Sequence, residues 1–426
     1  MVAVTGSAGP RLARRPAVVT VVVSAALVGG LAAVLVPWDW VPRGSLVPQQ
    51  ASALFTPEQV ERAERFAAWK RAFGWTSYFL SLAVLVVLGL TPRGARLLRR
   101  VVRRRRWWLA VPVAALTILV VERLVVLPFA VGAHETDLRF GISRQGYAAW
   151  SLDQVKSLAV SWVATSLLLL VIVGFARRAP RWWFAWAGSA ALALTVAGSF
   201  LYPVLVEPVF NKFTPMSAGP FKQSVFRLAA REGVQIDDVL VADASRRTTT
   251  LNAYVSGFGG TRRVVVYDNL LDELTPAEAR VVIAHELGHA KNDDVLLGTV
   301  LGGLGSVGAV TLLALLLDSE RVRRRADVAG AGEPAAVALV LALAAAGGFV
   351  ASPVQNTVSR AIEVRADRVA LEATGSAETF VQMQRRLALT SLADPTPPRL
   401  SQLWWGSHPT VLQRAGLPDS LRRADP

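Results

Sequence analysis

Long apolar runs are the most prominent feature of the sequence. A helix that crosses a bilayer needs about 20 mainly apolar residues, and about seven segments meet that requirement. These segments are residues 18–38, 73–90, 107–127, 158–176, 183–206, 295–317 and 335–354. The pattern predicts a mainly α-helical, polytopic membrane protein with about seven transmembrane helices.

The first apolar run has a second interpretation. It follows Arg11, Arg14 and Arg15, and a basic start before an apolar middle is also typical of a cleaved signal peptide. The run is long for such a peptide, however, and it ends at Trp38 and Trp40, which resemble an interfacial aromatic anchor. We therefore favour a retained span over a cleaved leader.

Composition excludes several classes of protein. Of the 426 residues, 53% are hydrophobic and only 18% are charged, whereas an average soluble chain has about 25% charged residues. The sequence has no cysteine, which rules out a disulfide framework, a thiolate metal site and a cysteine nucleophile. An ordinary soluble enzyme is therefore excluded.

The arrangement of the basic residues argues against nucleic-acid binding and predicts an orientation. The net charge is +15, but the arginines cluster beside apolar runs, which fits membrane lipid headgroups better than a nucleic-acid groove. The excess lies at the N-terminus and in residues 93–106, 177–181 and 321–325. With seven spans these segments share one side of the membrane, which the positive-inside rule makes cytoplasmic.

Two polar regions remain outside the apolar runs. The expected organisation is a five-span membrane domain (1–206), a first polar segment (207–294), a two-span hairpin (295–356) and a second polar segment (357–426). The polar segments total roughly 150 residues, enough for one modest α+β domain built from discontinuous sequence. The arginine distribution places this domain outside the cytoplasm, at the cell (plasma) membrane. The stretch after Ala393 is expected to be irregular and to pack against the rest of the protein through Trp404 and Trp405.

The first polar segment contains a metal-binding pattern on a predicted helix. Thr275, Pro276 and Glu278 form a strong helix start with a capping box. In the helix that follows, His285 and His289 are four residues apart, so both side chains project from one face and can bind one ion.

Glu286 lies beside these histidines, where it can accept a proton from a metal-bound water. The three residues form the H-E-x-x-H pattern of zinc proteases. A catalytic zinc needs a third protein ligand, and Glu363 and Asp367 lie one helical turn apart beyond the seventh span. One can bind zinc while the other orients a histidine. On spacing alone, a solvated charged helix face is an equally good interpretation.

A strand edge is expected near this site. Residues 248–255 predict a strand, and residues 256–260 would turn the chain into a second strand over 262–267. A protease can hold an extended peptide by adding it to such an edge, although an ordinary buried hairpin is the alternative. His134 has no motif around it and is expected in a loop.

Together these motifs resemble a known family, the membrane-embedded zinc proteases of the CAAX prenyl endopeptidase type. The resemblance extends over most of the chain. It rests on residues 140–143, 208–215, 243–247, 252–254, 285–289, 359–367 and 407–409. In that family the glutamate matching Glu363 is the third zinc ligand, and the aspartate matching Asp367 supports a ligand histidine. Asp293 is expected to play a similar supporting part.

The resemblance also implies residues that bind the substrate or stabilise the reaction. His408 is expected to point at the active site and to contact the oxyanion or the substrate backbone. The expected substrate-binding residues are Asn252, Ala253, Tyr254 and Arg414.

The sequence therefore predicts a zinc metalloendopeptidase with one Zn²⁺ per chain and Glu286 as general base. Its expected substrates are peptides or proteins that are membrane-associated or lipidated, in the manner of CAAX substrates. One alternative is a general quality-control protease for membrane proteins. Another is a non-proteolytic, metal-binding transporter or scaffold, for which Glu122 and Arg123 are the obvious ionisable residues inside a span. Prenyl endopeptidases present their zinc domain to the cytosol, so the orientation expected here departs from the resemblance.

Overall fold

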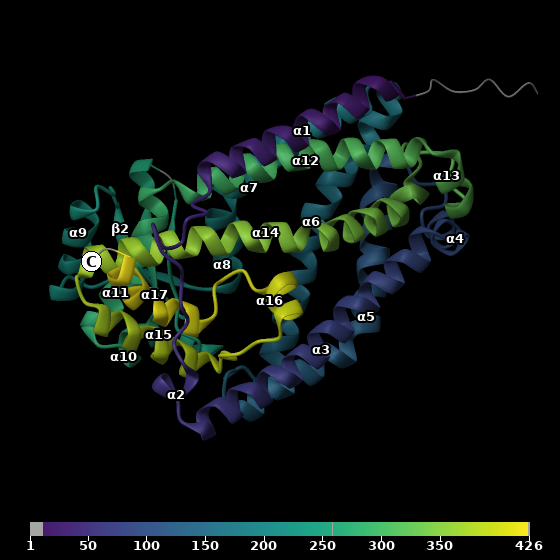
Figure 1. Cartoon of the computed structure of the whole chain (residues 1–426). Helices are drawn as coiled ribbons and strands as arrows, with labels where there is room; N and C mark the ends of the chain where they lie inside the picture. The colour runs from purple at the N-terminus through teal and green to yellow at the C-terminus, as the bar shows by residue number, and fades with distance from the viewer. Residues whose placement is uncertain (1–11, 258, 425–426) are drawn as a thin grey trace, which may run out of the picture.

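The computed structural model describes residues 12–257 and 259–424, most of them helical (Figure 1). Arg11 lies outside the described residues. Within the described part, seven helices are long and apolar enough to cross a membrane. They are α1 (Arg14–Leu35), α3 (Pro57–Gly89), α5 (Trp107–Phe140), α6 (Tyr147–Arg178), α7 (Trp183–Leu201), α12 (Asp294–Asp318) and α14 (Val337–Thr374). The predicted mainly α-helical membrane fold is confirmed.

Several of these helices extend well beyond the apolar runs that predicted them. A capping box between Thr56 and Gln59 starts α3 well before its apolar run. Helix α14 continues for 38 residues, from the seventh span to Thr374. It therefore passes unbroken through the domain boundary expected at residue 357 and joins the membrane bundle to the extramembrane domain.

Small residues let the membrane helices pack closely. Where α1 and α12 cross, the Ser24 hydroxyl donates to the Leu304 carbonyl, and a β-carbon on Gly308 would lie 2.9 Å from that hydroxyl. Gly89 of α3 approaches Ala342 of α14 in the same way. Glycine and alanine permit such short interhelical distances, and the buried core of the bundle is rich in alanine.

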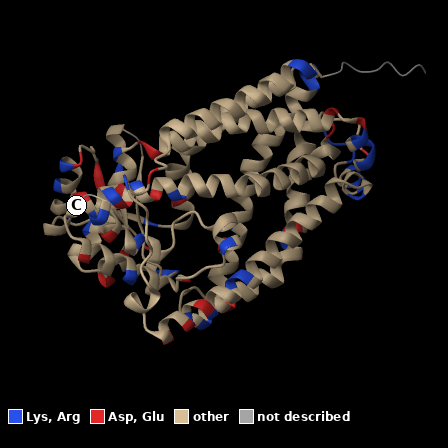
Figure 2. Cartoon of the chain, viewed as in Figure 1, with Lys and Arg blue, Asp and Glu red and all other residues tan. Residues whose placement is uncertain are grey.

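The arginine-rich segments gather at one end of the bundle, opposite the extramembrane domain (Figure 2). This end contains α4 (Pro92–Val101), α13 (Glu320–Ala326) and the loops that precede α7 and α14. Arg99 contacts Asp327 at 2.7 Å, and Arg177 donates to the Gly332 carbonyl at 2.9 Å. Segments far apart in sequence are therefore tied together at this end.

Glu122 and Arg123 each have a polar partner on a neighbouring helix. Glu122 accepts a hydrogen bond from Ser81 of α3 at 2.6 Å, and Arg123 donates to Gln154 of α6 at 3.3 Å. Both residues therefore connect α5 to its neighbours, which gives them a packing role.

The extramembrane domain contains a small mixed sheet. Its strands are β1 (Phe213–Pro215), β2 (Asp238–Ala242), β3 (Ala253–Ser256) and β4 (Arg263–Tyr267). The strand order is β1-β2-β4-β3, with β2 and β4 parallel and the other pairs antiparallel. Strand β3 is therefore an edge strand.

Both polar segments contribute to one hydrophobic core beside this sheet. Val264 of β4 and Ile283 of α11 (Pro276–Lys291) pack with Phe380 of α15 (Ala377–Ser391), and all three are buried. The remaining elements are α2 (Ala51–Leu54), α8 (Glu207–Phe210), α9 (Pro220–Arg231), α10 (Asp268–Glu273), α16 (Arg399–Trp405), α17 (Val411–Ala424), a π-helical turn (Tyr202–Val206) and 3₁₀ turns (Ala244–Arg246, Gly259–Thr261, Pro334–Ala336).

The predicted strand over residues 248–255 was too long. Only its last part forms β3, because the carbonyls of Thr248 and Thr250 accept hydrogen bonds from the Asn269 side chain. Thr249 instead donates from its backbone N–H to the Ile142 carbonyl at 3.0 Å. These contacts hold the segment against the end of α5 rather than in the sheet.

Two further predictions were wrong. His134 is not in a loop: α5 continues to Phe140, and His134 is buried with its ring stacked on Trp150 at 4.9 Å. The stretch after Ala393 is not irregular, because it contains α16 and α17. Aromatic packing stabilises α16, since Trp404 stacks on Phe349 and Trp405 on Trp75. The expected packing through Trp404 and Trp405 is therefore confirmed, although the sequence did not indicate their partners.

Candidate active site

Helix α11 begins with the predicted capping box. The side chain of Glu278 accepts hydrogen bonds from the backbone N–H and the hydroxyl of Thr275 at 2.9 and 2.8 Å. Arg386 of α15 also donates to Glu278 at 3.2 Å. The start of the helix is therefore fixed both locally and by the second polar segment, which sets the position of the residues that follow.

Helix α14 packs directly against α11 because of a glycine. A β-carbon on Gly288 would lie 3.1 Å from the Val369 Cβ and 3.3 Å from the Ala366 Cα. The absence of a side chain at this point lets the two helices approach closely. Glu363, on the same helix, is thereby placed over the two histidines.

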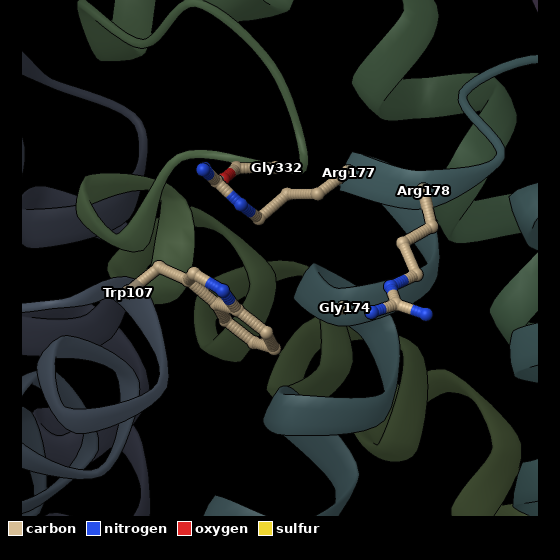
Figure 3. A pocket seen from close by; sticks show the side chains of 5 residues that line it. All are labelled: Trp107, Gly174, Arg177, Arg178 and Gly332. Atoms are coloured by element: carbon tan, nitrogen blue, oxygen red, sulfur yellow. The ribbon is translucent and has the colours of Figure 1, made fainter.

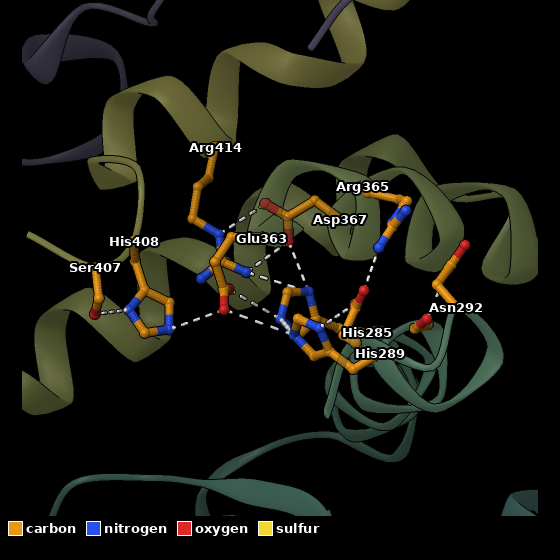
Figure 4. A network of polar contacts seen from close by, with 11 residues as sticks. His285, His289, Asn292, Glu363, Arg365, Asp367, Ser407, His408 and Arg414 are labelled. Carbon is orange, nitrogen blue, oxygen red and sulfur yellow. Dashed lines mark hydrogen bonds and ion pairs between the residues drawn. The ribbon is translucent and has the colours of Figure 1, made fainter. Parts of the chain in front are cut away.

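His285, His289 and Glu363 come together as predicted (Figure 4). One donor atom from each lies within 4.8 Å of the others. The two Nε2 atoms are 3.2 Å apart, and Glu363 lies 3.3 Å from His285 Nε2 and 3.6 Å from His289 Nε2. This set of two imidazoles and one carboxylate is compact enough to bind a single ion.

A carboxylate holds each histidine from the other side. His285 Nδ1 is 2.9 Å from Asp367, and His289 Nδ1 is 2.9 Å from Asp294. Each Nδ1–H donates to its carboxylate, so both Nε2 atoms face the centre of the cluster. Arg365 pairs with Asp294 in turn. Such supporting carboxylates fix the orientation of metal-binding histidines.

The prediction for Asp293 was wrong by one residue. Asp293 is largely exposed and pairs with Arg262 at 2.7 Å, whereas Asp294 is buried and contacts His289. Helix α11 ends at Lys291, and Asp293 adopts a left-handed backbone conformation with φ of 50° before α12 begins. The helical spacing from His289 therefore does not continue to Asp293.

Arg414 also differs from its predicted role. Its guanidinium is largely buried and donates to both oxygens of Asp367, one of them at 2.8 Å. Arg414 therefore holds the carboxylate that supports His285, rather than facing an open substrate position.

The charges around His285 favour a cation at the centre of the cluster. Burial opposes the charged imidazole, but Asp367 and Glu363 outweigh it and raise the pKa of His285 to about 10. One oxygen of Glu363, Oε2, is buried and faces His285 Nε2 at 3.3 Å without the geometry of a hydrogen bond. Two facing Nε2 atoms and an unsatisfied carboxylate oxygen are stabilised by a proton or by a metal ion, so these residues fit a metal.

Glu286 lies next to the cluster but outside it. Its side chain is half-buried, and it has no hydrogen-bond or ion-pair partner among the residues that the structure describes. Burial raises the pKa of Glu286 above its usual value, with the nearby histidines acting in the opposite direction. A carboxyl group without a fixed partner and with a raised pKa is suited to proton transfer.

His408 reaches the cluster from the open side. Its Nε2 is 3.4 Å from Glu363, and its side chain is 57% exposed. The Ser407 hydroxyl lies 2.9 Å from His408 Nδ1. Burial of part of the ring lowers the pKa of His408. If Ser407 donates to Nδ1, a neutral His408 carries its proton on Nε2, where it can donate into the site.

Strand β3 packs on α11 and has a free edge. Asn252 accepts a hydrogen bond from the backbone of Tyr267, so in an antiparallel ladder the backbone groups of Ala253 and Val255 point away from β4. The Tyr254 hydroxyl donates to Glu207 at 3.0 Å. The predicted segment therefore offers backbone partners beside the histidines, with Tyr254 fixed by the end of the fifth span.

Sequence reasoning missed several of these residues. Asp294, Arg365 and Glu207 each act through a contact made in three dimensions. The role of Asp294 can be recognised only once it is known that helix α11 ends at Lys291. Arg365 and Glu207 meet partners 71 and 47 residues away in sequence.

Both the membrane bundle and the extramembrane domain are similar in sequence to known proteins. Residues 41–212 match the CAAX prenyl protease N-terminal family, with five membrane helices, and residues 215–416 match peptidase family M48. An uncharacterized metalloprotease of Bacillus subtilis, YhfN, is 30% identical over 296 residues, which cover 69% of this chain and 70% of that protein. A CAAX prenyl protease 1 homolog of Dictyostelium discoideum is 29% identical over 289 residues, 65% of each protein.

A solved structure has the same fold. The crystal structure of S. mikatae Ste24p matches with a TM-score of 0.77 and covers 94% of this chain and 98% of that one, at 20% sequence identity. Together with the two family matches and the bacterial relative, this similarity accounts for the membrane bundle and the extramembrane domain. The chain belongs to peptidase family M48, as a multi-pass membrane metalloprotease related to the CAAX prenyl proteases.

Proposed function

We propose that this protein is a zinc metalloendopeptidase that cleaves peptide bonds in membrane-associated or lipidated substrates. The observation that carries the proposal is the convergence of His285, His289 and Glu363 within 4.8 Å. Two histidines and a glutamate are a known ligand set of catalytic zinc, which keeps a fourth position open. One Zn²⁺ per chain is expected, and the protease domain comprises residues 207–294 and 357–426.

When bound at these ligands, zinc supplies a Lewis acid that polarises the scissile carbonyl and lowers the pKa of the attacking water. Glu286 accepts the proton of that water and then delivers it to the leaving amine. His408 donates from Nε2 to the oxygen of the tetrahedral species. Asp367 and Asp294 keep the two imidazoles oriented throughout.

The substrate is held in an extended conformation along β3. The outward-pointing groups of Ala253 and Val255 supply backbone hydrogen bonds, while Asn252 and Tyr254 border the bound segment. Recognition through the backbone tolerates many side chains, so access along the membrane bundle selects the substrate. The lipidated class follows from the relatives named as CAAX prenyl proteases.

The proposed orientation follows from the arginine-rich end. That end lies opposite the extramembrane domain (Figure 2), and the positive-inside rule therefore supports an extracytoplasmic protease domain. We propose the plasma membrane as its location. Reporter fusions at residue 317 and at the C-terminus test this: the first should report cytoplasm and the second the outer compartment. The reverse pattern would make the zinc domain cytosolic.

Cleavage of a reporter peptide by the purified full-length protein tests the enzymatic proposal. A chelator should abolish cleavage, and stoichiometric zinc should restore it. The same assay with prenylated and unprenylated versions of one peptide tests the substrate class. Equal cleavage of both would favour general processing of membrane proteins, and cleavage that survives complete zinc removal would refute the zinc mechanism.

A further inference from the structure

A cavity lies at the arginine-rich end of the bundle, opposite the domain that contains His285, His289 and Glu363 (Figure 2). Figure 3 shows the side chains that line it. The cavity has a volume of about 520 Å³ and is lined by Trp107, Gly174, Arg177, Arg178 and Gly332. The residues come from the start of α5, the end of α6 and the loop before α14. The proposed protease chemistry uses none of them.

Contacts within the protein hold the lining residues of this cavity in place. Arg177 donates to the Gly332 carbonyl at 2.9 Å, and its guanidinium carbon lies 5.7 Å from the centroid of the Trp107 ring, a cation–π contact. A β-carbon on Gly174 would lie 3.3 Å from that ring, so glycine leaves room for the indole beside α6. Arg177 therefore keeps a fixed direction at the edge of the cavity.

Arg178 supplies a second positive charge. Its side chain has no hydrogen-bond or ion-pair partner among the described residues, although it lines the same space (Figure 3). A fixed guanidinium, a free guanidinium and an indole around one space match a phosphate group, which arginine binds with strong charge-assisted hydrogen bonds.

The surroundings leave these charges without protein counterions. Residues 12–15, 90–107, 177–182 and 318–333 contain 17 arginines but only 4 acidic residues. All four acids already pair with arginines, and these acids are Asp318, Glu320, Asp327 and Glu333. This excess of positive charge attracts anions to this end of the bundle.

The position of the cavity relative to the membrane interface indicates that its ligand is a lipid. Trp108, Trp182 and Trp186 are exposed in the adjacent turns and mark the membrane interface. Farther along α6, toward the middle of the bundle, Leu167 is also exposed, so it can contact acyl chains. We propose that this cavity binds the phosphate of an anionic phospholipid headgroup, with the acyl chains lying along α5 and α6.

Lipid retention by the purified full-length protein tests this proposal. Native mass spectrometry would compare bound phosphatidylglycerol with phosphatidylcholine for the wild type and for Arg177→Gln/Arg178→Gln. The matched control is Arg103→Gln/Arg104→Gln, which removes the same charge from exposed arginines at the same end. The wild type should prefer phosphatidylglycerol about tenfold or more, the cavity variant should lose that preference, and the control should keep most of it.

The single variant Arg178→Gln keeps the hydrogen bond between Arg177 and Gly332, and Arg178 itself has no hydrogen-bond or ion-pair partner among the described residues. This variant should reduce the preference for phosphatidylglycerol about fivefold. Equal losses in the cavity and control variants would reduce the site to general surface charge and overturn the proposal. So would an absence of preference in the wild type. Displacement of the lipid by millimolar inorganic phosphate would assign the cavity to free phosphate instead. None of these readouts depends on protease activity.

Discussion

Gly288 lies directly against Ala366, with the position of its missing β-carbon 3.3 Å from the Ala366 Cα. This contact fixes how far α14 stands from α11, and therefore how far Glu363 stands from the histidines. Gly288→Leu should push the helices apart and reduce zinc bound by the purified protein several-fold, since overpacking shifts backbones. Gly298→Leu is the matched control, because nothing lies within 4 Å of a β-carbon there. Full zinc occupancy in Gly288→Leu would contradict the role of this contact.

Glu286→Gln should keep zinc but lose catalysis. The amide cannot accept the proton of the attacking water, so kcat should fall by about 10²–10⁴, while metal analysis shows one zinc per chain. Glu372→Gln, an exposed position on α14, should behave like the wild type. If Glu286→Gln cleaved peptides at the normal rate, another group would have to act as the base.

Asp294→Asn and Asp293→Asn distinguish two adjacent carboxylates. Asp294 contacts His289, so its loss should weaken zinc binding about 10–100-fold. Asp293 pairs with Arg262 at the surface, and its substitution should leave zinc affinity within a factor of about two. The measurement is competition for zinc with a chelator of known affinity. Equal effects of the two changes would refute the assignment of Asp294.

Zinc binding should release a proton and become tighter as the pH rises. In the metal-free protein the pKa of His285 is raised to about 10, so below that pH its imidazole carries a proton that zinc must displace. Affinity should therefore increase about tenfold per pH unit across the neutral range and level off near pH 10. Calorimetry in two buffers with different ionisation enthalpies counts the released protons. A zinc affinity that does not change with pH would show that His285 is already neutral.

Val255→Pro should weaken substrate binding without unfolding the sheet. The N–H of residue 255 points to the free edge, so proline removes a donor for the substrate but no ladder bond to β4. KM for a peptide should rise several-fold while zinc content stays at one per chain. An unchanged KM would indicate that peptides bind elsewhere. The comparison variant is Val255→Thr, which keeps the N–H.

Much of the fold was predictable because lipid contact demands long apolar runs, and the H-E-x-x-H spacing follows directly from helix geometry. The role of Glu363 was harder to predict from the sequence. Its spacing from Asp367 is equally compatible with a solvated helix face, and only the family resemblance favoured a metal ligand. Asp294 was missed because the left-handed residue before it interrupts the helix. Arg414 was misassigned because its contact with Asp367 spans 47 residues and depends on how α17 packs.

The unbroken course of α14 has a consequence for biosynthesis. Glu363, the third proposed metal ligand, lies on the same helix as the last span and is synthesised after both His285 and His289. A nascent chain that ends before this span holds only two of the three donors. The proposed metal site can therefore be completed only once the last span has been synthesised, and shorter chains lack its third ligand.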